Sequence, residues 1–279
     1  MSAGRAIRAA LVQLSSGDDP EANLAETLAR LDEARGADLI LTPEVTNCVS
    51  GSRARQEEVL RTEAEDPTLA AIRDWARAAA TPVLIGSLAL RREDEARFAN
   101  RSFLIAADGG IAACYDKVHM FDADPAEGES YRESSGYRPG ERAVLARAAG
   151  VSVGMTVCYD LRFPALYRAL AQAGAELLTV PSAFSRPTGA AHWEVLLRAR
   201  AIETGCWVLA PAQTGTHPTS TDRVRRSWGH SLVVAPWGEV VLDMGEAPGV
   251  GFAAIDPAAV AEARRKVPSL AHDRAWSGP

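Results

Sequence analysis

A chain of 279 residues with 47% hydrophobic and 24% charged residues is an ordinary globular mixture, long enough for one large α/β domain or about two average domains. The 30 Lys and Arg residues against 36 Asp and Glu residues give a net charge of −6 without a basic block, which argues against nucleic acid as a partner. No apolar run approaches the ~18 residues that a membrane span needs, so we expect no membrane partner either.

The first half of the chain alternates predicted strands and helices. Residues 7–14 form a mostly apolar run typical of a buried strand, and Asp19 and Pro20 then supply an N-cap and a first-turn proline for a helix. A second strand begins at Leu39 and stops before Glu44. The further predicted elements are a helix beginning at Pro67, a strand at 83–86, and a hairpin of strands at 100–107 and 111–115.

The second half repeats this order after a long polar stretch. Residues 122–142 show little periodicity and predict a loop, and a loop of that length in a compact domain is usually either functional or evidence of a wrong assignment. The predicted elements after it are a strand at 151–157, a helix beginning at Pro164, a strand at 177–180, a helix at 188–204, a strand at 206–210, and two strands at 231–235 and 239–243. The repeated order predicts an internal duplication within one α/β domain spanning residues 1–279, with a C-terminal tail from about 257 to 279.

Three ionisable residues of different kinds, Glu44, Lys117 and Cys158, each come just after a predicted strand. Ligands of α/β sheets bind at the carboxyl ends of strands, so these side chains are candidates for one shared site. Each also has a purely structural alternative. A free cysteine is commonly a small buried residue, a glutamate can cap a helix or lie on the surface, and a lysine is usually an exposed charge.

A Cys–Glu–Lys set is chemically coherent for attack on an amide. Cys158 stands before a helix beginning near Pro164, where free backbone N–H groups are expected to lower the thiol pKa and to bind an oxyanion. Glu44 is expected to be partly desolvated, which raises a carboxyl pKa and suits a general base. Lys117 is one of only two lysines among 30 basic residues, and its compact ammonium is expected to stabilise an oxyanion together with the Tyr159 N–H.

Other reaction classes lack their motifs. There is no GxSxG elbow, Walker loop, GxGxxG after a strand or HExxH, and the five histidines show no ligand spacing. The four cysteines are widely spaced without a CxxC pair, which argues against a disulfide framework or a zinc site. The first apolar stretch contains Arg8 and Gln13 and does not resemble a signal peptide. We therefore expect a reduced, cytoplasmic protein without a metal, in which the role of Cys48 stays open.

Three segments resemble the nitrilase superfamily of carbon–nitrogen hydrolases: LTPE at 41–44, YDKVHMFD at 115–122 and CYDLRFP at 158–164. The resemblance implies a four-layer α-β-β-α sandwich, with the family's glutamate, lysine and cysteine at Glu44, Lys117 and Cys158. A second family glutamate, which orients the lysine and the substrate amide, resembles Glu133. The family also implies a homodimer through helices next to the nucleophile, no metal or organic cofactor, and a ping-pong reaction through a thioester. We expect the C-terminal tail to pack on the partner subunit.

Residues 182–184 and 188–203 resemble the amidase branch of this superfamily, and 192–204 is closer to the type that acts on deaminated glutathione. This resemblance implies an amidase that converts a small carboxylate-bearing carboxamide into an acid plus ammonia, with deaminated glutathione as the expected substrate. The alternatives are an omega-amidase acting on 2-oxoglutaramate, a broader aliphatic amidase, and a catalytically inactive scaffold of the same fold.

Several residues near these motifs are expected to contact the substrate. They are Tyr159 and Phe184 as walls for the acyl chain, Arg162 as a carboxylate clamp, and His192 and Trp193 at the start of a helix beside the pocket. For Arg162, an ion pair with Asp160 or Glu44 is an equally open alternative to the bidentate clamp. The loops at 53–66 and 216–226 are particular to this sequence and rim the expected pocket, so they bear on substrate choice.

Overall fold

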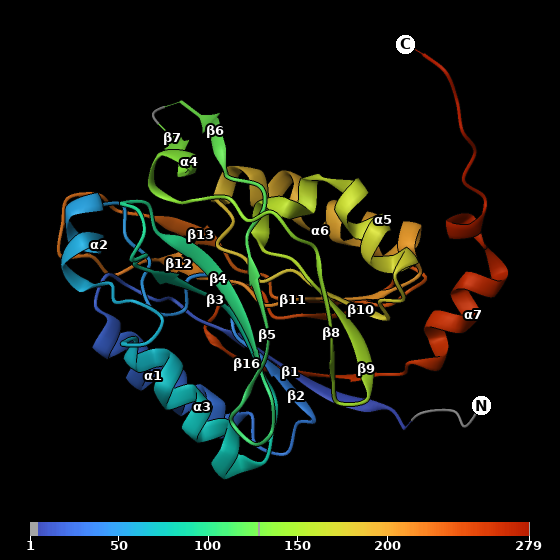
Figure 1. The fold of residues 1–279 in the computed structure, drawn as a ribbon, viewed down its shortest axis with the longest axis horizontal. Coiled ribbons are helices and arrows are strands. Elements are labelled where there is room, and N and C mark those ends of the chain that lie inside the picture. Colours follow the sequence, from blue (N-terminus) through green and yellow to red (C-terminus); the bar gives the residue numbers. More distant parts are fainter. Residues whose placement is uncertain (1–4, 128, 279) are drawn as a thin grey trace.

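The computed structural model describes residues 5–127 and 129–278. Its frame is a pair of six-stranded mixed sheets (Figure 1). The first sheet has the order β16–β1–β2–β3–β4–β5, with β1 (Ile7–Gln13), β2 (Leu39–Leu41), β3 (Val83–Leu90), β4 (Ala99–Ile105), β5 (Ile111–Asp116) and β16 (Gly249–Ile255). The second sheet has the order β15–β14–β11–β10–β9–β8, with β8 (Val144–Ala148), β9 (Val151–Met155), β10 (Leu177–Thr179), β11 (Trp207–Ala210), β14 (Leu232–Val234) and β15 (Val240–Asp243).

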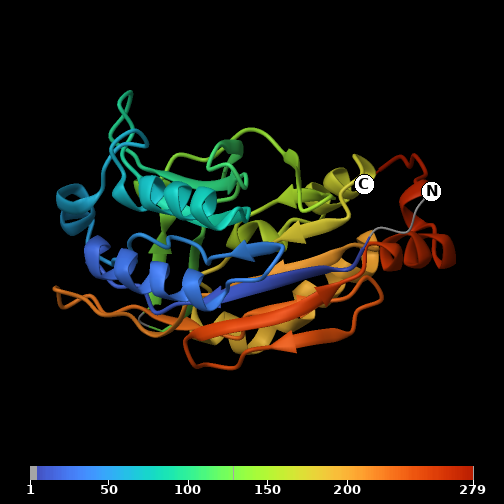
Figure 2. The same ribbon diagram turned by 90° about the horizontal axis from the view of Figure 1, so that it is seen from below.

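Helices cover the outer face of each sheet, which confirms the predicted four-layer α-β-β-α sandwich (Figures 1 and 2). The first sheet carries α1 (Pro20–Glu33) and α3 (Pro67–Ala79), and the second carries α5 (Pro164–Gln172) and α6 (Arg186–Thr204). Helices α1 and α3 begin at the predicted prolines. The side chains of Asp19 and Asp66 accept hydrogen bonds from first-turn backbone N–H groups there, so the start of each helix is set locally.

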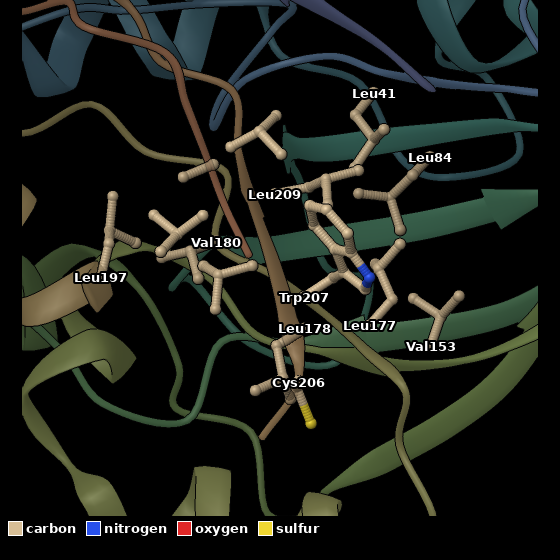
Figure 3. Packing of buried hydrophobic residues seen from close by; sticks show 14 of the residues in the cluster. Leu41, Leu84, Val153, Leu177, Leu178, Val180, Leu197, Cys206, Trp207 and Leu209 are labelled. Carbon is tan, nitrogen blue, oxygen red and sulfur yellow. The ribbon is translucent and has the colours of Figure 1, made fainter. Parts of the chain in front are cut away.

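A continuous apolar core fills the space between the sheets (Figure 3). Leu41 and Leu84 of the first sheet pack with Leu177, Trp207 and Leu209 of the second. Alternate residues of β1 belong instead to a second apolar cluster beneath α1 and α3. Burial of the sheets on both faces explains why their central strands are continuous apolar runs in the sequence.

The two sheets repeat one pattern, which confirms the predicted duplication. Strands β1, β2 and β3 are mutually parallel, and so are β9, β10 and β11. On one side, each trio pairs with one antiparallel strand, β16 beside β1 and β8 beside β9. On the other side, each sheet continues as an antiparallel ladder of two strands, β4 and β5 beyond β3, and β14 and β15 beyond β11. Parallel strands end at a common edge, so the chain segments that follow β2 and β9 are brought to comparable places in the two halves.

Residues 122–142 are not the structureless loop that the sequence predicted. They contain a hairpin of β6 (Asp122–Ala126) and β7 (Glu129–Arg132) and the helical turn α4 (Glu133–Gly136), which project from the sandwich (Figure 1). The prediction was wrong because both strands are half exposed and lack an apolar alternation. The other elements that the sequence did not reveal are α2 (Arg53–Val59) within the 53–66 loop, the strands β12 (Thr214–Thr216) and β13 (Arg226–Trp228) that flank the 216–226 loop, and the edge strands β8 and β16.

The C-terminal segment leaves the sandwich after β16. It forms α7 (Ala258–Lys266) and a 3₁₀ turn, η2 (Ser269–Ala271), and then runs outward in extended form (Figure 1). The side chain of Gln172 on α5 donates to Asp273 at 2.6 Å and holds the start of this extension. Trp276 beyond it is 85% exposed. No helix within residues 5–127 and 129–278 is long and apolar enough to cross a lipid bilayer.

Candidate active site

Three of the predicted residues meet where strands of both sheets end. Glu44 follows β2, Lys117 follows β5 and Cys158 follows β9. The Nζ atom of Lys117 lies 2.9 Å from Oε1 of Glu44, and the charge of the same carboxylate acts on the Cys158 thiol. The three residues are between 2% and 8% exposed, and they line one cavity of about 750 Å³. The structure thus brings together side chains that the sequence predicted to share a site.

Cys158 occupies a tight turn at the start of a 3₁₀ helix, η1 (Cys158–Arg162). Its φ of 48° is in the left-handed region, which non-glycine residues rarely adopt outside turns and functional sites. Its own N–H donates to the backbone oxygen of Pro181 at 3.0 Å, whereas the N–H of Tyr159 has no acceptor among residues 5–127 and 129–278. The turn therefore presents the sulfur together with one free backbone donor.

The protonation state of this thiol differs from the one that the sequence predicted. Burial, followed by the charge of Glu44, raises the pKa of Cys158 well above its ordinary value, although Lys117 acts in the opposite direction. The predicted lowering by free backbone N–H groups was wrong, because desolvation dominates and one of those groups is already bonded to Pro181. Cys158 is therefore a neutral thiol near pH 7.

The Glu44 carboxylate is held by several donors. Its Oε1 accepts hydrogen bonds from Lys117 Nζ and Asn100 Nδ2, both at 2.9 Å, and its Oε2 accepts one from the N–H of Ala183 at 2.8 Å. Burial by itself raises the pKa of this carboxyl, but the charge of Lys117 and the hydrogen bonds outweigh burial, so the pKa of Glu44 lies below its ordinary value. The expected net increase was wrong, because the hydrogen bonds from Asn100 and the Ala183 N–H, which the sequence did not reveal, add to the effect of Lys117. Glu44 is therefore an ionised carboxylate on the cavity that also holds the neutral Cys158 thiol.

Glu133, at the start of α4, completes the surroundings of the ammonium. The Nζ atom of Lys117 lies 2.9 Å from Oε1 and 2.8 Å from Oε2 of Glu133, and the N–H of Phe121 donates to that Oε2 at 2.6 Å. Burial alone lowers the pKa of Lys117, but the charges of Glu133 and Glu44 reverse this and raise it well above its ordinary value. The hairpin of β6 and β7 thus leads into a turn that fixes a second carboxylate on Lys117.

Asn100 on β4 is a site residue that the sequence reasoning missed. Its Nδ2 donates to Glu44 Oε1 at 2.9 Å and to Glu133 Oε1 at 3.3 Å. The residue is 2% exposed, and within the described part of the chain its Oδ1 atom has no hydrogen-bond partner. An amide in a strand that was predicted at 100–107 is a signal that could have revealed it, because an amide that the strand buries requires partners.

The five residues predicted to contact the substrate are not among those that line this cavity. They pack on one another instead. Nη2 of Arg162 lies 3.2 Å from Nδ1 of His192, and the guanidinium lies 5.5 Å from the ring of Phe184 and 6.0 Å from that of Tyr159. Phe184 in turn packs on Trp193, with 4.9 Å between ring centroids. The geometry therefore supports neither of the roles considered for Arg162.

The two loops that the sequence placed at the rim of the pocket both contribute lining residues. The arginines on the cavity wall are Arg53 from α2, Arg97, Arg132 from β7, and Arg223 and Arg225 from the 216–226 loop. Cys48 lies in a separate buried apolar cluster with Val45 and Leu60, and burial raises the pKa of its thiol to about 12. Within residues 5–127 and 129–278, no group of three or more His, Cys, Asp or Glu side chains is arranged to hold a metal ion.

Comparison with known proteins agrees with this geometry. A model of the carbon–nitrogen hydrolase family matches residues 8–265. A deaminated glutathione amidase of Yersinia enterocolitica is 38% identical over 268 residues, which cover 95% of this chain and 92% of that protein. The crystal structure of the Caenorhabditis elegans NitFhit protein superposes with a TM-score of 0.89 at 34% identity, covering 98% of this chain and 66% of that one.

An amidase of the nitrilase superfamily from Nesterenkonia sp. AN1 superposes with a TM-score of 0.76 at 27% identity, covering 95% of this chain and 97% of that one. In a variant of that enzyme, the acetamide moiety of fluoroacetamide is added covalently at the active-site cysteine. The family match spans nearly the whole chain, and the two stacked sheets are those of the similar structures. The chain therefore belongs to the carbon–nitrogen hydrolase family and is an amidase-type enzyme of the nitrilase superfamily.

Proposed function

We propose that this enzyme hydrolyses the C–N bond of a small carboxylate-bearing amide through a thioester on Cys158. The observation that carries the proposal is that Cys158, Glu44 and Lys117 line one cavity, with the ammonium 2.9 Å from the Glu44 carboxylate. A neutral thiol and an ionised carboxylate that can accept its proton thus lie next to a cation in one cavity. Glu133 and Asn100 act as positioning residues, because each is hydrogen-bonded to this set.

The first half-reaction begins with transfer of the thiol proton to Glu44 while the sulfur attacks the amide carbonyl carbon. The positive charge of Lys117 and the free N–H of Tyr159 stabilise the oxyanion that forms, and a donor such as this N–H is typically worth about 2.7–4 kcal/mol. When the C–N bond breaks, Glu44 returns the proton to the departing nitrogen. The products of this step are a thioester on Cys158 and a free amine or ammonia.

Water completes the cycle in the second half-reaction. Glu44 takes a proton from the water as its oxygen attacks the thioester carbonyl, and the same oxyanion donors act again. The C–S bond breaks, the sulfur recovers its proton from Glu44, and the carboxylic acid leaves. A single carboxylate serves both halves because it ends each one in its starting protonation state.

We propose deaminated glutathione as the substrate, because a relative 38% identical over 95% of this chain bears the name deaminated glutathione amidase. The 2-oxoglutaryl amide of that compound is a secondary amide, so its hydrolysis releases cysteinylglycine. Release of ammonia, as expected from the sequence, applies to primary amides such as 2-oxoglutaramate. Both compounds yield 2-oxoglutarate as the acid, and they differ only in the leaving group.

A substrate panel tests the proposal. The purified enzyme is incubated with deaminated glutathione, 2-oxoglutaramate and butanamide, while 2-oxoglutarate or butanoate is measured together with the released amine or ammonia. We expect the highest kcat/KM for deaminated glutathione. A preference for 2-oxoglutaramate would instead identify the enzyme as an omega-amidase, and a preference for butanamide would identify it as a broader aliphatic amidase. Absence of hydrolysis for every amide would favour the non-catalytic scaffold.

We also propose that the enzyme is a homodimer that packs through α5 and α6, with the C-terminal tail on the partner. The outward face of α6 supports this proposal, because Val195 is 67% and Ile202 57% exposed, an arrangement typical of a covered surface. Trp276 on the tail is still more exposed and is available for an apolar contact with a partner. Sedimentation velocity is expected to give a dimer, and the double variant Val195→Asp, Ile202→Asp a monomer. A monomeric wild type would contradict the proposal.

A further inference from the structure

Lys117, the cation at the centre of the site, has no donor left for a substrate carboxylate. Its three N–H groups face three acceptor oxygens, Oε1 of Glu44 and both oxygens of Glu133, at 2.8–2.9 Å. An anionic substrate of the kind proposed above therefore needs a different cation on the cavity wall. Without one, its carboxylate would lose hydration without compensation.

Five arginines line the cavity, and three of them are already paired with carboxylates. The pairs are Arg53 with Glu57 at 2.8 Å, Arg97 with Glu95 at 3.0 Å, and Arg132 with Asp124 at 2.9 Å. Arg223 and Arg225 form no ion pair with any carboxylate of residues 5–127 and 129–278. Of these two, Arg223 is exposed, whereas Arg225 is half-buried. The charge of Arg225 is thus the better placed of the two inside the cavity.

The segment that carries Arg225 is anchored at both ends. It connects β12 to β13, and the N–H of His217 donates to the backbone oxygen of Arg225 at 3.0 Å. The buried His217 ring lies 2.8 Å from the backbone oxygen of Ser16 through Nδ1 and 2.7 Å from Ser227 Oγ through Nε2. Further along, Asp18 accepts the N–H of Ser220 at 2.8 Å. These contacts tie the loop to the segment after β1, so the arginine is positioned before any ligand arrives.

The guanidinium of Arg225 faces an aromatic ring. Its central carbon lies 5.7 Å from the ring centroid of Tyr131, whose hydroxyl is 3.3 Å from Oε2 of Glu129. An aromatic face attracts a guanidinium without using its N–H groups, which stay available for a planar oxyanion. The hairpin that leads to Glu133 therefore also supplies the ring that Arg225 faces.

We propose that Arg225 binds the substrate carboxylate that lies away from the scissile amide and thereby selects anionic amides over neutral ones. This inference rests on the proposed amide hydrolysis and assigns its specificity. A carboxylate bound bidentately by an arginine is among the stronger polar contacts in proteins. In deaminated glutathione the carboxylate could belong to the acyl part or to the leaving dipeptide, and the test distinguishes the two.

The test compares succinamate with butanamide, which differ only by a carboxylate in place of a methyl group. For Arg225→Gln we expect KM for succinamate to rise about 10- to 100-fold with kcat nearly unchanged, and kinetics with butanamide to stay as in the wild type. Arg225→Lys keeps the charge but not the bidentate geometry, so its KM for succinamate is expected to lie between those of the wild type and Arg225→Gln. Arg97→Gln is the matched control, because that arginine lines the same cavity but is paired with Glu95. An equal loss on both amides, or no change on succinamate, would overturn the assignment.

A binding measurement separates this inference from the proposed reaction. Calorimetric titration of 2-oxoglutarate and of cysteinylglycine into the wild type and Arg225→Gln requires no turnover. If the variant binds only 2-oxoglutarate more weakly, the carboxylate belongs to the acyl part. If it binds only cysteinylglycine more weakly, the carboxylate belongs to the leaving group. If both ligands bind the variant as tightly as the wild type, Arg225 has no such role. If the wild type hydrolyses no amide but its binding of 2-oxoglutarate depends on Arg225, the proposed hydrolysis is refuted and the carboxylate site at Arg225 is supported.

Discussion

The Nδ2 atom of Asn100 lies 2.9 Å from Oε1 of Glu44, although 56 positions separate the two residues in the chain. The same nitrogen reaches Glu133 at 3.3 Å, so one amide spans the two carboxylates that share Lys117. The Asn100 oxygen has no hydrogen-bond partner among the residues described, and the residue lines the cavity. Because its amide nitrogen joins both carboxylates, Asn100 is expected to matter for the position and charge of Glu44.

Asn100→Ala is expected to move the acid limb of kcat/KM to higher pH. The hydrogen bond from Asn100 lowers the pKa of Glu44, so its removal raises that pKa and protonates the carboxylate at less acidic pH. The pH–rate profile of the wild type and the variant measures this shift. A lower kcat at every pH with an unmoved acid limb would instead mean that Asn100 serves packing alone.

Replacement of Cys158 by Ala is expected to abolish turnover, while Ala at Cys48, Cys114 or Cys206 keeps most of it. Only Cys158 among the four thiols lines the cavity with Glu44 and Lys117. Mass spectrometry of the protein mixed with substrate is expected to find an acyl adduct that is missing in Cys158→Ala. Loss of activity in Cys114→Ala equal to that in Cys158→Ala would refute the assignment of the nucleophile.

Lys117→Arg is expected to lower kcat by about 10²- to 10³-fold although it keeps the positive charge. The ammonium fits among oxygens at 2.8–2.9 Å in a position that is 2% exposed, and the longer, planar guanidinium cannot take its place without displacing Glu133 or Glu44. Steady-state kinetics measures the effect, and thermal unfolding of the variant checks that the fold is retained. Near-full activity would show that only the charge is required.

His217 is expected to make the protein less stable as the pH falls from about 6.5 to about 4. Burial, followed by the charge of Arg225, lowers the pKa of this ring to about 4 in the folded protein, whereas the unfolded chain binds the proton near 6.5. The His217 ring therefore costs no stability above pH 6.5, and below that pH the free energy of unfolding falls by about 1.4 kcal/mol per pH unit. Denaturant unfolding at pH 7, 6 and 5 measures this slope. In His217→Gln the slope should be shallower by that amount, and parallel curves would contradict the prediction.

Local patterns predicted much of the frame. The starts of α1 and α3 follow from Asp19-Pro20 and Asp66-Pro67, where the cap and the proline act within one turn of the helix. The edge strand β16 escaped prediction because it is half exposed and contains two glycines, so its place is set by pairing with β1 at the other end of the chain. The hairpin of β6 and β7 was missed for the same reason, since neither strand has an apolar face of its own.

The sequence by itself determined the order of the central strands and the main covering helices and the candidates Glu44, Lys117 and Cys158, because periodicity, caps and strand ends are local properties of the chain. Only the tertiary structure decided which protons these residues hold. The Glu44 carboxylate takes its donors from residues 56, 73 and 139 positions away, and they reverse the effect that burial alone would have on its pKa. The free charge of Arg225 is likewise a tertiary property, since an arginine is free or paired according to what distant segments place beside it.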